Sequence, residues 1–261
     1  MKKLFFILFA ITLSVSCIKK ENGTVLKIGV TPVPHAEILK IVSEDLEKEG
    51  IKLEIINFED AVIPNQEVAN KGLDANYIQH TPYMEDFNKK YNTKLVSAGK
   101  IHVEPLAMYS KKIKSINDLT PGAEILIPNN ATNLGRALLL LDKSGIIKLK
   151  DNTKLDSTVN DIVKNPKKLK IIPMAAEQIA PRINEVEGAI INGNFAIANN
   201  LTITDDAILV EDKDSPYANI VTVLDGNQNN EAIQKLMKAL QSEKVKKFIE
   251  EKYKGSVIPA F

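Results

Sequence analysis

Short apolar runs alternate with amphipathic stretches along the chain from residue 25 onward. Runs rich in Val, Ile and Leu predict short strands at residues 25–30, 52–58, 75–78, 95–98, 124–127, 169–172, 189–191 and 220–224. Apolar side chains recur at helical spacing between them, which predicts helices at residues 34–49, 65–70, 133–143, near 177–186, 230–240 and 243–252. Thr81, ahead of Pro82, is expected to cap one further helix, and Thr132 the helix at 133–143.

This alternation predicts an α/β fold with mainly parallel strands and helices on both faces of the sheet. We expect two lobes, one formed by residues 25–107 together with 220–261 and the other by residues 108–219. A ligand cleft is expected between the lobes, at the carboxyl ends of the strands. Such a fold locates a site without naming its ligand.

The N-terminus has the pattern of an export signal. Lys2 and Lys3 precede an almost wholly apolar stretch, Leu4–Val15, and the only cysteine, Cys17, follows directly. The stretch is too short to span a bilayer as a mature helix. Leu13–Cys17 is similar to the cleavage motif of bacterial lipoproteins, although Ser14 stands where Leu is commonest. We therefore predict a signal peptide at residues 1–16 and a lipidated tether at 17–24, with a secretory signal and a chance cysteine as the alternative.

Composition excludes several classes of function. Lys plus Arg is 34 and Asp plus Glu is 33, so the net charge is +1, and a nucleic-acid partner is not expected. No nucleophile elbow, phosphate-binding loop or dinucleotide fingerprint is present, so we predict that the protein is not an enzyme and uses no cofactor. No later apolar run reaches about 18 residues, which predicts a soluble body behind the anchor.

Arginine usage points to one position. The chain has only two arginines, Arg136 and Arg182, and its other basic side chains are lysines. Arg136 follows a predicted strand and lies in the first turn of a predicted helix, where free N–H groups favour an anion. A guanidinium binds a carboxylate through two parallel hydrogen bonds, and Gly135 would allow a ligand close approach. The alternative is a surface ion pair, which is the interpretation we favour for Arg182.

Polar side chains also stand at predicted strand ends. Asn192 follows residues 189–191, and Asn219 precedes residues 220–224. Both could bond the backbone of an amino acid, or could serve local turns. His80 is expected to line the cleft ahead of a helix. The aromatic residues Tyr77, Tyr83 and Phe58 are candidate walls for an apolar side chain, with core packing as the alternative.

A metal site is not predicted. His35, His80 and His102, the three histidines, together with Glu104 could in principle hold an ion. Their spacing, however, matches no zinc signature, and no His-rich loop accompanies them.

Several ordered motifs resemble the methionine-binding lipoproteins of the MetQ/NlpA family over nearly the whole mature length. They are Lys27–Val30, Gly72–Asn76, Gln79–Tyr83, His102–Leu106, Tyr109–Lys112, Ile127–Asn129, Thr132–Leu141, Ile191–Ala196 and Asp214–Asn219. The resemblance implies a two-lobed, type II periplasmic-binding-protein fold. It also implies a lipoprotein of the cell envelope that delivers methionine to the permease and ATPase of an ABC importer.

By the same resemblance, Arg136 holds the ligand carboxylate and Asn192 and Asn219 bond the ligand backbone. His80, His102 and Glu104 line the pocket, with Glu104 the candidate for the α-amino group. The chain departs from the family at Ala61 and Ile78, where many members carry an aromatic residue. Other ligands therefore stay open: D-methionine, another apolar amino acid or a Met-containing dipeptide. A surface lipoprotein acting mainly in host contact is a further alternative.

Overall fold

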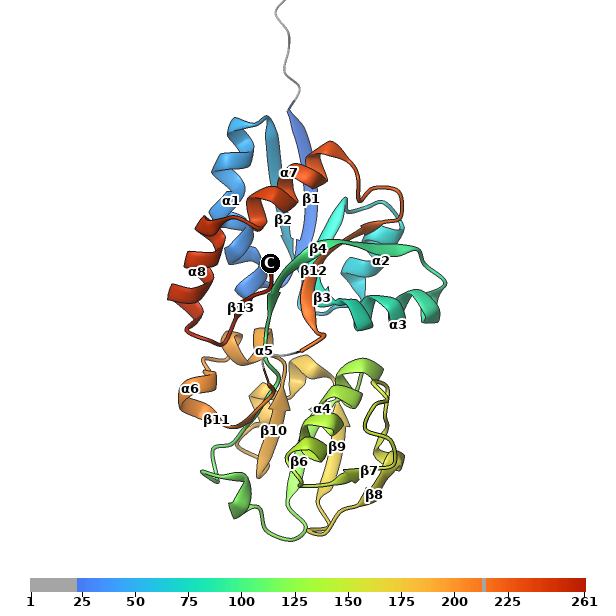
Figure 1. Cartoon of the computed structure of the whole chain (residues 1–261), viewed down its shortest axis with the longest axis vertical. Helices are drawn as coiled ribbons and strands as arrows, with labels where there is room; N and C mark the ends of the chain where they lie inside the picture. The colour runs from blue at the N-terminus through green and yellow to red at the C-terminus, as the bar shows by residue number, and fades with distance from the viewer. Residues whose placement is uncertain (1–22, 213–214) are drawn as a thin grey trace, which may run out of the picture.

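The computed structural model describes residues 23–212 and 215–261. The predicted signal peptide, Cys17 and most of the predicted tether lie outside the described residues. The described chain forms two halves, each with its own β-sheet and flanking helices, stacked along the long axis of the molecule (Figure 1).

The larger half has a six-stranded sheet in the order β13-β4-β12-β3-β1-β2. Strand β1 runs parallel to β2 and β3, whereas β12 runs antiparallel to both β3 and β4. Apolar cores lie against α1, α7 and α8 in one cluster and against α2 and α3 in another. The bounds are β1 (Thr24–Val30), β2 (Ile51–Asn57), β3 (Ala75–His80), β4 (Leu95–Val103), β12 (Ala218–Leu224), β13 (Ile258–Pro259), α1 (Glu37–Lys48), α2 (Ile63–Ala69), α3 (Thr81–Tyr91), α7 (Glu231–Leu240) and α8 (Glu243–Tyr253).

The smaller half has a five-stranded sheet in the order β11-β5-β10-β6-β9, and α4 packs on it with the largest core cluster of this half. A separate hairpin, β7 with β8, lies beside it. The bounds are β5 (Ala107–Tyr109), β6 (Glu124–Pro128), β7 (Lys148–Leu149), β8 (Ile162–Lys164), β9 (Lys170–Met174), β10 (Gly188–Ile191), β11 (Ala207–Val210), α4 (Ala131–Lys143), α5 (Gly193–Ala198) and α6 (Ile203–Asp206).

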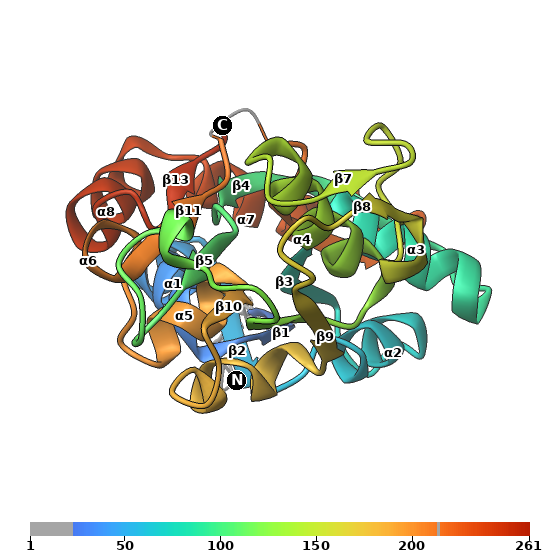
Figure 2. The same cartoon turned by 90° about the horizontal axis from the view of Figure 1, so that it is seen from below.

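The two halves meet on two sides. The chain passes between the sheets after β4 and again after β11. Helix α4 of the smaller half lies next to α3 of the larger half, as both views show (Figures 1 and 2). On the other side, α5 contacts the helical turn Pro32–Ala36 that follows β1. These contacts leave the ends of the central strands facing each other.

Four local expectations were wrong. Both sheets are mixed rather than mainly parallel, because β5, β11, β12 and β13 run antiparallel to their neighbours.

The other three concern helices. His80, not Thr81, caps α3, since its Nδ1 accepts a hydrogen bond from the Tyr83 N–H at 3.2 Å. Likewise the side chain of Asn130, not Thr132, caps α4. Residues 177–186 form no α-helix; two 3₁₀ turns, Ala176–Gln178 and Ala180–Arg182, stand there because Pro181 lacks the N–H that a helix needs.

Candidate functional site

A cavity of about 230 Å³ lies between the two sheets. Four of its polar lining residues directly follow strands: Thr31 after β1, Glu104 after β4, Asn129 after β6 and Asn192 after β10. His80 is the last residue of β3. The described structure thus has a cavity at the carboxyl ends of strands from both sheets, which is where open α/β folds bind ligands.

Six of the nine binding residues predicted from the sequence line this cavity: His80, Tyr83, Glu104, Arg136, Asn192 and Asn219. Tyr77 does not, because neighbouring residues of β3 point to opposite faces and its ring enters the core. Phe58 packs in the core cluster beside α2 and α3. His102 lies behind Glu104 and does not line the cavity. The roles assigned to all nine residues stay predictions.

Arg136 projects from the second turn of α4 and is only 4% exposed. Its Nε donates to Glu211 Oε1 at 2.9 Å, and its Nη2 donates to Glu211 Oε2 at 2.5 Å and to the Glu104 carbonyl oxygen at 2.9 Å. The guanidinium carbon also lies 4.3 Å from the centroid of the Tyr217 ring. The guanidinium of Arg136 therefore makes its two parallel hydrogen bonds to Glu211, and its Nη1 makes no hydrogen bond with the described residues.

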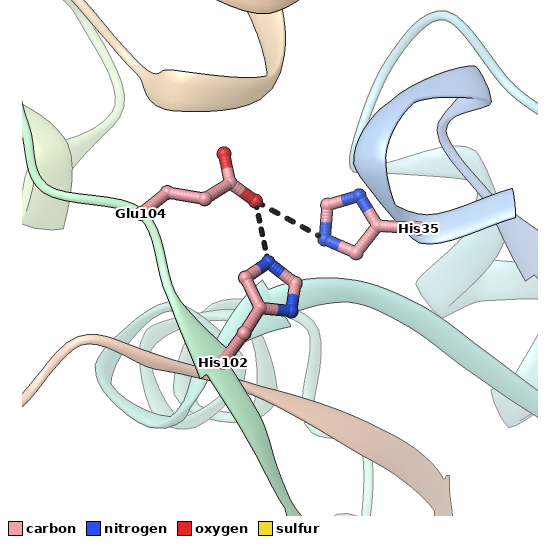
Figure 3. A group of neighbouring side chains, drawn as sticks. All are labelled: His35, His102 and Glu104. Carbon is pink, nitrogen blue, oxygen red and sulfur yellow. Dashed lines mark hydrogen bonds and ion pairs between the residues drawn. The ribbon is translucent and has the colours of Figure 1, made fainter. Parts of the chain in front are cut away.

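Glu104 sits beside two buried histidines (Figure 3). His102 Nε2 donates to Glu104 Oε1 at 2.8 Å, while His102 Nδ1 accepts from the Tyr77 hydroxyl. His35 Nε2 lies 3.5 Å from the same carboxylate oxygen. Burial acts to raise the pKa of the Glu104 carboxyl, but the hydrogen bond from His102 and nearby positive charge outweigh it and lower the pKa. Glu104 is thus an anion, and its Oε2 makes no hydrogen bond with the described residues.

His35 and Asn219 extend this network. His35 Nε2 donates to Asn219 Oδ1 at 3.2 Å, and its Nδ1 lies 2.6 Å from the hydroxyl of Thr31. The amide of Asn219 reaches Glu104 Oε1 at 3.5 Å. Burial lowers the pKa of His35 to about 4, so the ring is neutral at neutral pH.

A second network crosses between the halves. Because His80 Nδ1 caps α3, its proton resides on Nε2, which donates to Asn133 Oδ1 on α4 at 3.1 Å. Asn192 donates to the same oxygen from Nδ2 at 3.2 Å. The other amide atom, Asn192 Oδ1, is buried and has no hydrogen-bond partner among the described residues. A buried acceptor left unpaired is costly, which points to a donor that a ligand would bring.

Apolar residues from both halves form another part of the wall: Ala61, Val62, Ile78, Ala175, Ala176 and Phe195. Ala61 and Ile78 thus line the cavity at the two positions where the sequence departs from the family pattern. Gly135 does not face a ligand: a side chain there would meet the backbone of residues 155–157, so the close approach is made by the chain itself.

Sequence reasoning missed several lining residues, among them Thr31, His35 and Asn133. The signal that could have found His35 is its place in the first loop after β1, at the same sheet edge as His80. Asn133 carries a weaker signal, since it stands one turn before Arg136 on the same helix. Glu211, which bonds Arg136 but does not line the cavity, carried no sequence signal, because it lies 75 residues from Arg136 along the chain.

His35, His102 and Glu104 also form a group whose ligand atoms lie within 4.8 Å of one another. Such a set of two imidazoles and a carboxylate could hold a divalent transition metal. Hydrogen bonds to Glu104 and Asn219 already engage both Nε2 atoms, so the same geometry is also complete as a network without an ion.

In the described part of the chain, no helix is both long enough and apolar enough to cross a membrane.

Comparison with known proteins places the chain among close relatives. Residues 26–261 match the profile of NlpA lipoproteins. The methionine-binding lipoprotein MetQ of Bacillus subtilis is 43% identical over 247 residues, which cover 92% of this chain and 88% of that protein. The probable D-methionine-binding lipoprotein MetQ of Haemophilus influenzae is 42% identical over 235 residues, which cover 89% and 86%. A nutrient binding protein from Burkholderia cenocepacia, solved bound to methionine, superposes with a TM-score of 0.88 at 42% identity and covers 90% of this chain and 100% of that one.

Two α/β halves with a polar cavity between their strand ends define a two-lobed binding protein of the periplasmic-binding-protein type. The family match extends through both halves, from β1 to the last residue. The chain belongs to the NlpA lipoprotein family.

Proposed function

We propose that this protein is the extracytoplasmic substrate-binding lipoprotein of an ABC importer and that its ligand is methionine. The relatives named for methionine binding cover most of the chain at 42–43% identity, and one similar structure contains methionine. The protein binds and delivers its ligand and catalyses no reaction.

One observation carries this proposal: the cavity offers unpaired groups of both signs. Arg136, Glu104 and Asn192 all line the cavity. Among the described residues, nothing hydrogen-bonds Arg136 Nη1, a donor on a cation, or the acceptors Glu104 Oε2, on an anion, and Asn192 Oδ1. A free amino acid is a zwitterion with the complementary pair. Its carboxylate would bind Arg136 and its ammonium group would bind Glu104 and Asn192, with Asn219 and His80 beside them. Buried charges need such partners, because unpaired ones are expensive.

The apolar wall suits the side chain of the ligand. Ala61, Val62, Ile78 and Phe195 would surround a thioether, and Tyr83 would supply a further aromatic contact. The same wall is compatible with leucine or with D-methionine, and a Met-containing dipeptide is a larger alternative. These are different ligands for one class of protein.

We further propose that Cys17 carries the acyl anchor and that residues 18–24 tether the body to the membrane in the cell envelope. Two lobes, residues 25–107 with 220–261 and residues 108–219, would close on the ligand and present it to a permease coupled to an ATPase. Several acyl chains anchor a protein stably at about 0.8 kcal/mol per buried CH₂.

A ligand panel tests the function. The soluble body from residue 18 onward is unfolded in guanidinium and refolded, so that any co-purified ligand is removed. Thermal unfolding is then recorded with L-methionine, D-methionine, L-leucine and a Met-containing dipeptide, because ligand at about 100 times Kd adds roughly 2.7 kcal/mol of stability. We expect L-methionine or D-methionine to give the largest shift. A panel in which no amino acid shifts the transition would instead favour a host-contact role.

A further inference from the structure

The two arginines of the chain each pair with a glutamate, in opposite surroundings. Arg182 donates to Glu185 on the surface, where their side chains are 50% and 56% exposed. Arg136 donates to Glu211 in the interior, where the exposures are 4% and 16%. An exposed pair contributes little, whereas a buried one fixes geometry and is costly to break. The chain thus contains a buried pair and a matched surface control.

Glu211 fixes the guanidinium from the side away from the cavity. It lines a second hollow behind Arg136 and is not part of the ligand cavity's lining. Both of its oxygens accept from Arg136, through Nε and Nη2. Because guanidinium is planar, two such bonds set both its position and its plane. Among the described residues Nη1 is the guanidinium nitrogen that makes no hydrogen bond, so it is the one available to a ligand in the cavity that Arg136 lines.

Glu211 is itself held by the other connection between the halves. Its Oε2 accepts from the Leu106 N–H at 3.2 Å, and its own N–H donates to the Leu106 carbonyl oxygen at 2.8 Å. Leu106 lies between β4 and β5, and Glu211 directly follows β11. The carboxylate therefore joins both connecting segments to the guanidinium, which also bonds the Glu104 carbonyl.

We propose that Glu211 is a positioning residue for ligand binding: it orients Arg136 so that Nη1 alone is offered to the carboxylate of the bound amino acid. Arg136 then binds that carboxylate end-on rather than through its two-bond fork. This inference rests on the proposed function, because it needs an amino acid whose carboxylate meets Arg136.

Charge adds a second consequence. Glu211 offsets the positive charge of Arg136, so the guanidinium alone is a weak attractor for a free anion. Because Glu211 already neutralises Arg136, the negative charge of Glu104 has no further counter-charge among the described residues that line the cavity. An ammonium group of the ligand would supply it. The arrangement selects a zwitterion over a carboxylic acid that lacks an amino group.

The test is a double-mutant cycle of Arg136→Ala and Glu211→Gln, with Glu185→Gln as the surface control. Glutamine keeps the shape but presents only one oxygen, so it cannot accept from both Arg136 nitrogens and from Leu106. Affinity for methionine is measured by calorimetry on refolded protein. We expect Glu211→Gln to weaken binding roughly 10- to 100-fold, as for loss of a charged hydrogen bond, and Glu185→Gln to leave it unchanged.

The cycle separates positioning from general damage. If Glu211 acts through Arg136, Glu211→Gln should cost less than about threefold in the Arg136→Ala background, because the two residues are coupled. An equal penalty in both backgrounds, or unchanged affinity in Glu211→Gln alone, would overturn the inference. If the unsubstituted protein binds methionine while the cycle is additive, only the role of Glu211 fails. If it binds no amino acid, the proposed function fails as well.

Discussion

The ionisation of single side chains determines what the cavity can bind. His80 and His35 are buried, and burial disfavours their charged form. The charge of Arg136 adds to burial at His80 and lowers the pKa of its ring to about 3, and burial lowers the pKa of His35 to about 4. Both rings are neutral at pH 7, so the buried charges of the cavity are those of Arg136 and Glu104.

This neutrality has a measurable cost at low pH. The unfolded chain takes up a proton at His80 near pH 6.5, whereas the folded chain does so only near pH 3. The unfolded state therefore binds more protons between these values, and the stability of the fold falls as pH drops below 6.5. At pH 5 the neutral His80 ring lowers the free energy of unfolding by about 2 kcal/mol, because each pH unit below 6.5 costs about 1.36 kcal/mol.

We predict that His80→Asn makes stability less sensitive to pH. Asparagine also caps a helix and does not titrate in this range. The free energy of unfolding, measured in urea at pH 7 and pH 5, should fall less in the variant, by about 2 kcal/mol. Equal losses in the variant and the unsubstituted protein would show that His80 is not held neutral by burial. His35 remains in both proteins and contributes equally.

At the scale of elements, the sequence predicts most strands and helices but not their ends. The predicted strand and helix order was sufficient to place Asn192 and Arg136 beside the cleft, whereas Glu104 was placed there only by the family resemblance, because the predicted strand 95–98 stops short of the end of β4. The sequence did not predict on which side of the sheet the rings of Tyr77 and Phe58 lie, because a shift of one residue along a strand reverses that side. Glu211 could not be predicted, since only tertiary packing brings it to Arg136.

Helix caps show why the ends were misplaced. Asn130, Ala131 and Thr132 offer two capping side chains within three residues, and both types are common caps. The chain uses the first: Asn130 Oδ1 accepts from the Asn133 N–H at 3.1 Å. The Thr132 hydroxyl is buried, and no residue in the described part of the chain hydrogen-bonds it. Local sequence cannot choose between them, because the choice depends on where β6 delivers the chain.

The two candidate caps should respond differently to substitution. Asn130→Ala removes the cap of α4 and should destabilise the protein by about 1 kcal/mol, within a usual range of 0.5–2. Thr132→Val replaces an unpaired buried hydroxyl with a methyl group of similar shape and should be neutral or slightly stabilising. Chemical denaturation of both variants measures the difference. A larger loss for Thr132→Val would assign the cap to Thr132 after all.

For the whole molecule, contacts between the halves hold the two walls of the cavity together. His80 of the larger half donates to Asn133 of the smaller, and Gly193 at the start of α5 lies against Glu104. A side-chain carbon at Gly193 would lie 2.6 Å from Glu104 Cβ and 2.7 Å from its Oε2. Real carbon atoms do not approach so closely, so only glycine lets α5 pack beside the carboxylate. The packing of the halves and the placement of Glu104 therefore both depend on the absence of a side chain at Gly193.

Gly193→Ala should weaken ligand binding without unfolding the protein. The added methyl group must displace Glu104 or hold the halves apart, and either change separates Glu104 from the ligand ammonium. We expect an affinity loss of at least about tenfold, since about 1.4 kcal/mol of lost pairing suffices, and an unfolding midpoint close to that of the unsubstituted ligand-free protein. Gly188→Ala is the matched control: its methyl group meets the flexible end of Met108 within the smaller half, so it should affect stability and leave affinity unchanged. Small-angle scattering with saturating methionine adds a direct readout, because halves held apart give a larger radius of gyration. Unchanged affinity together with an unchanged radius would mean that the contact between Gly193 and Glu104 is not needed to close the site.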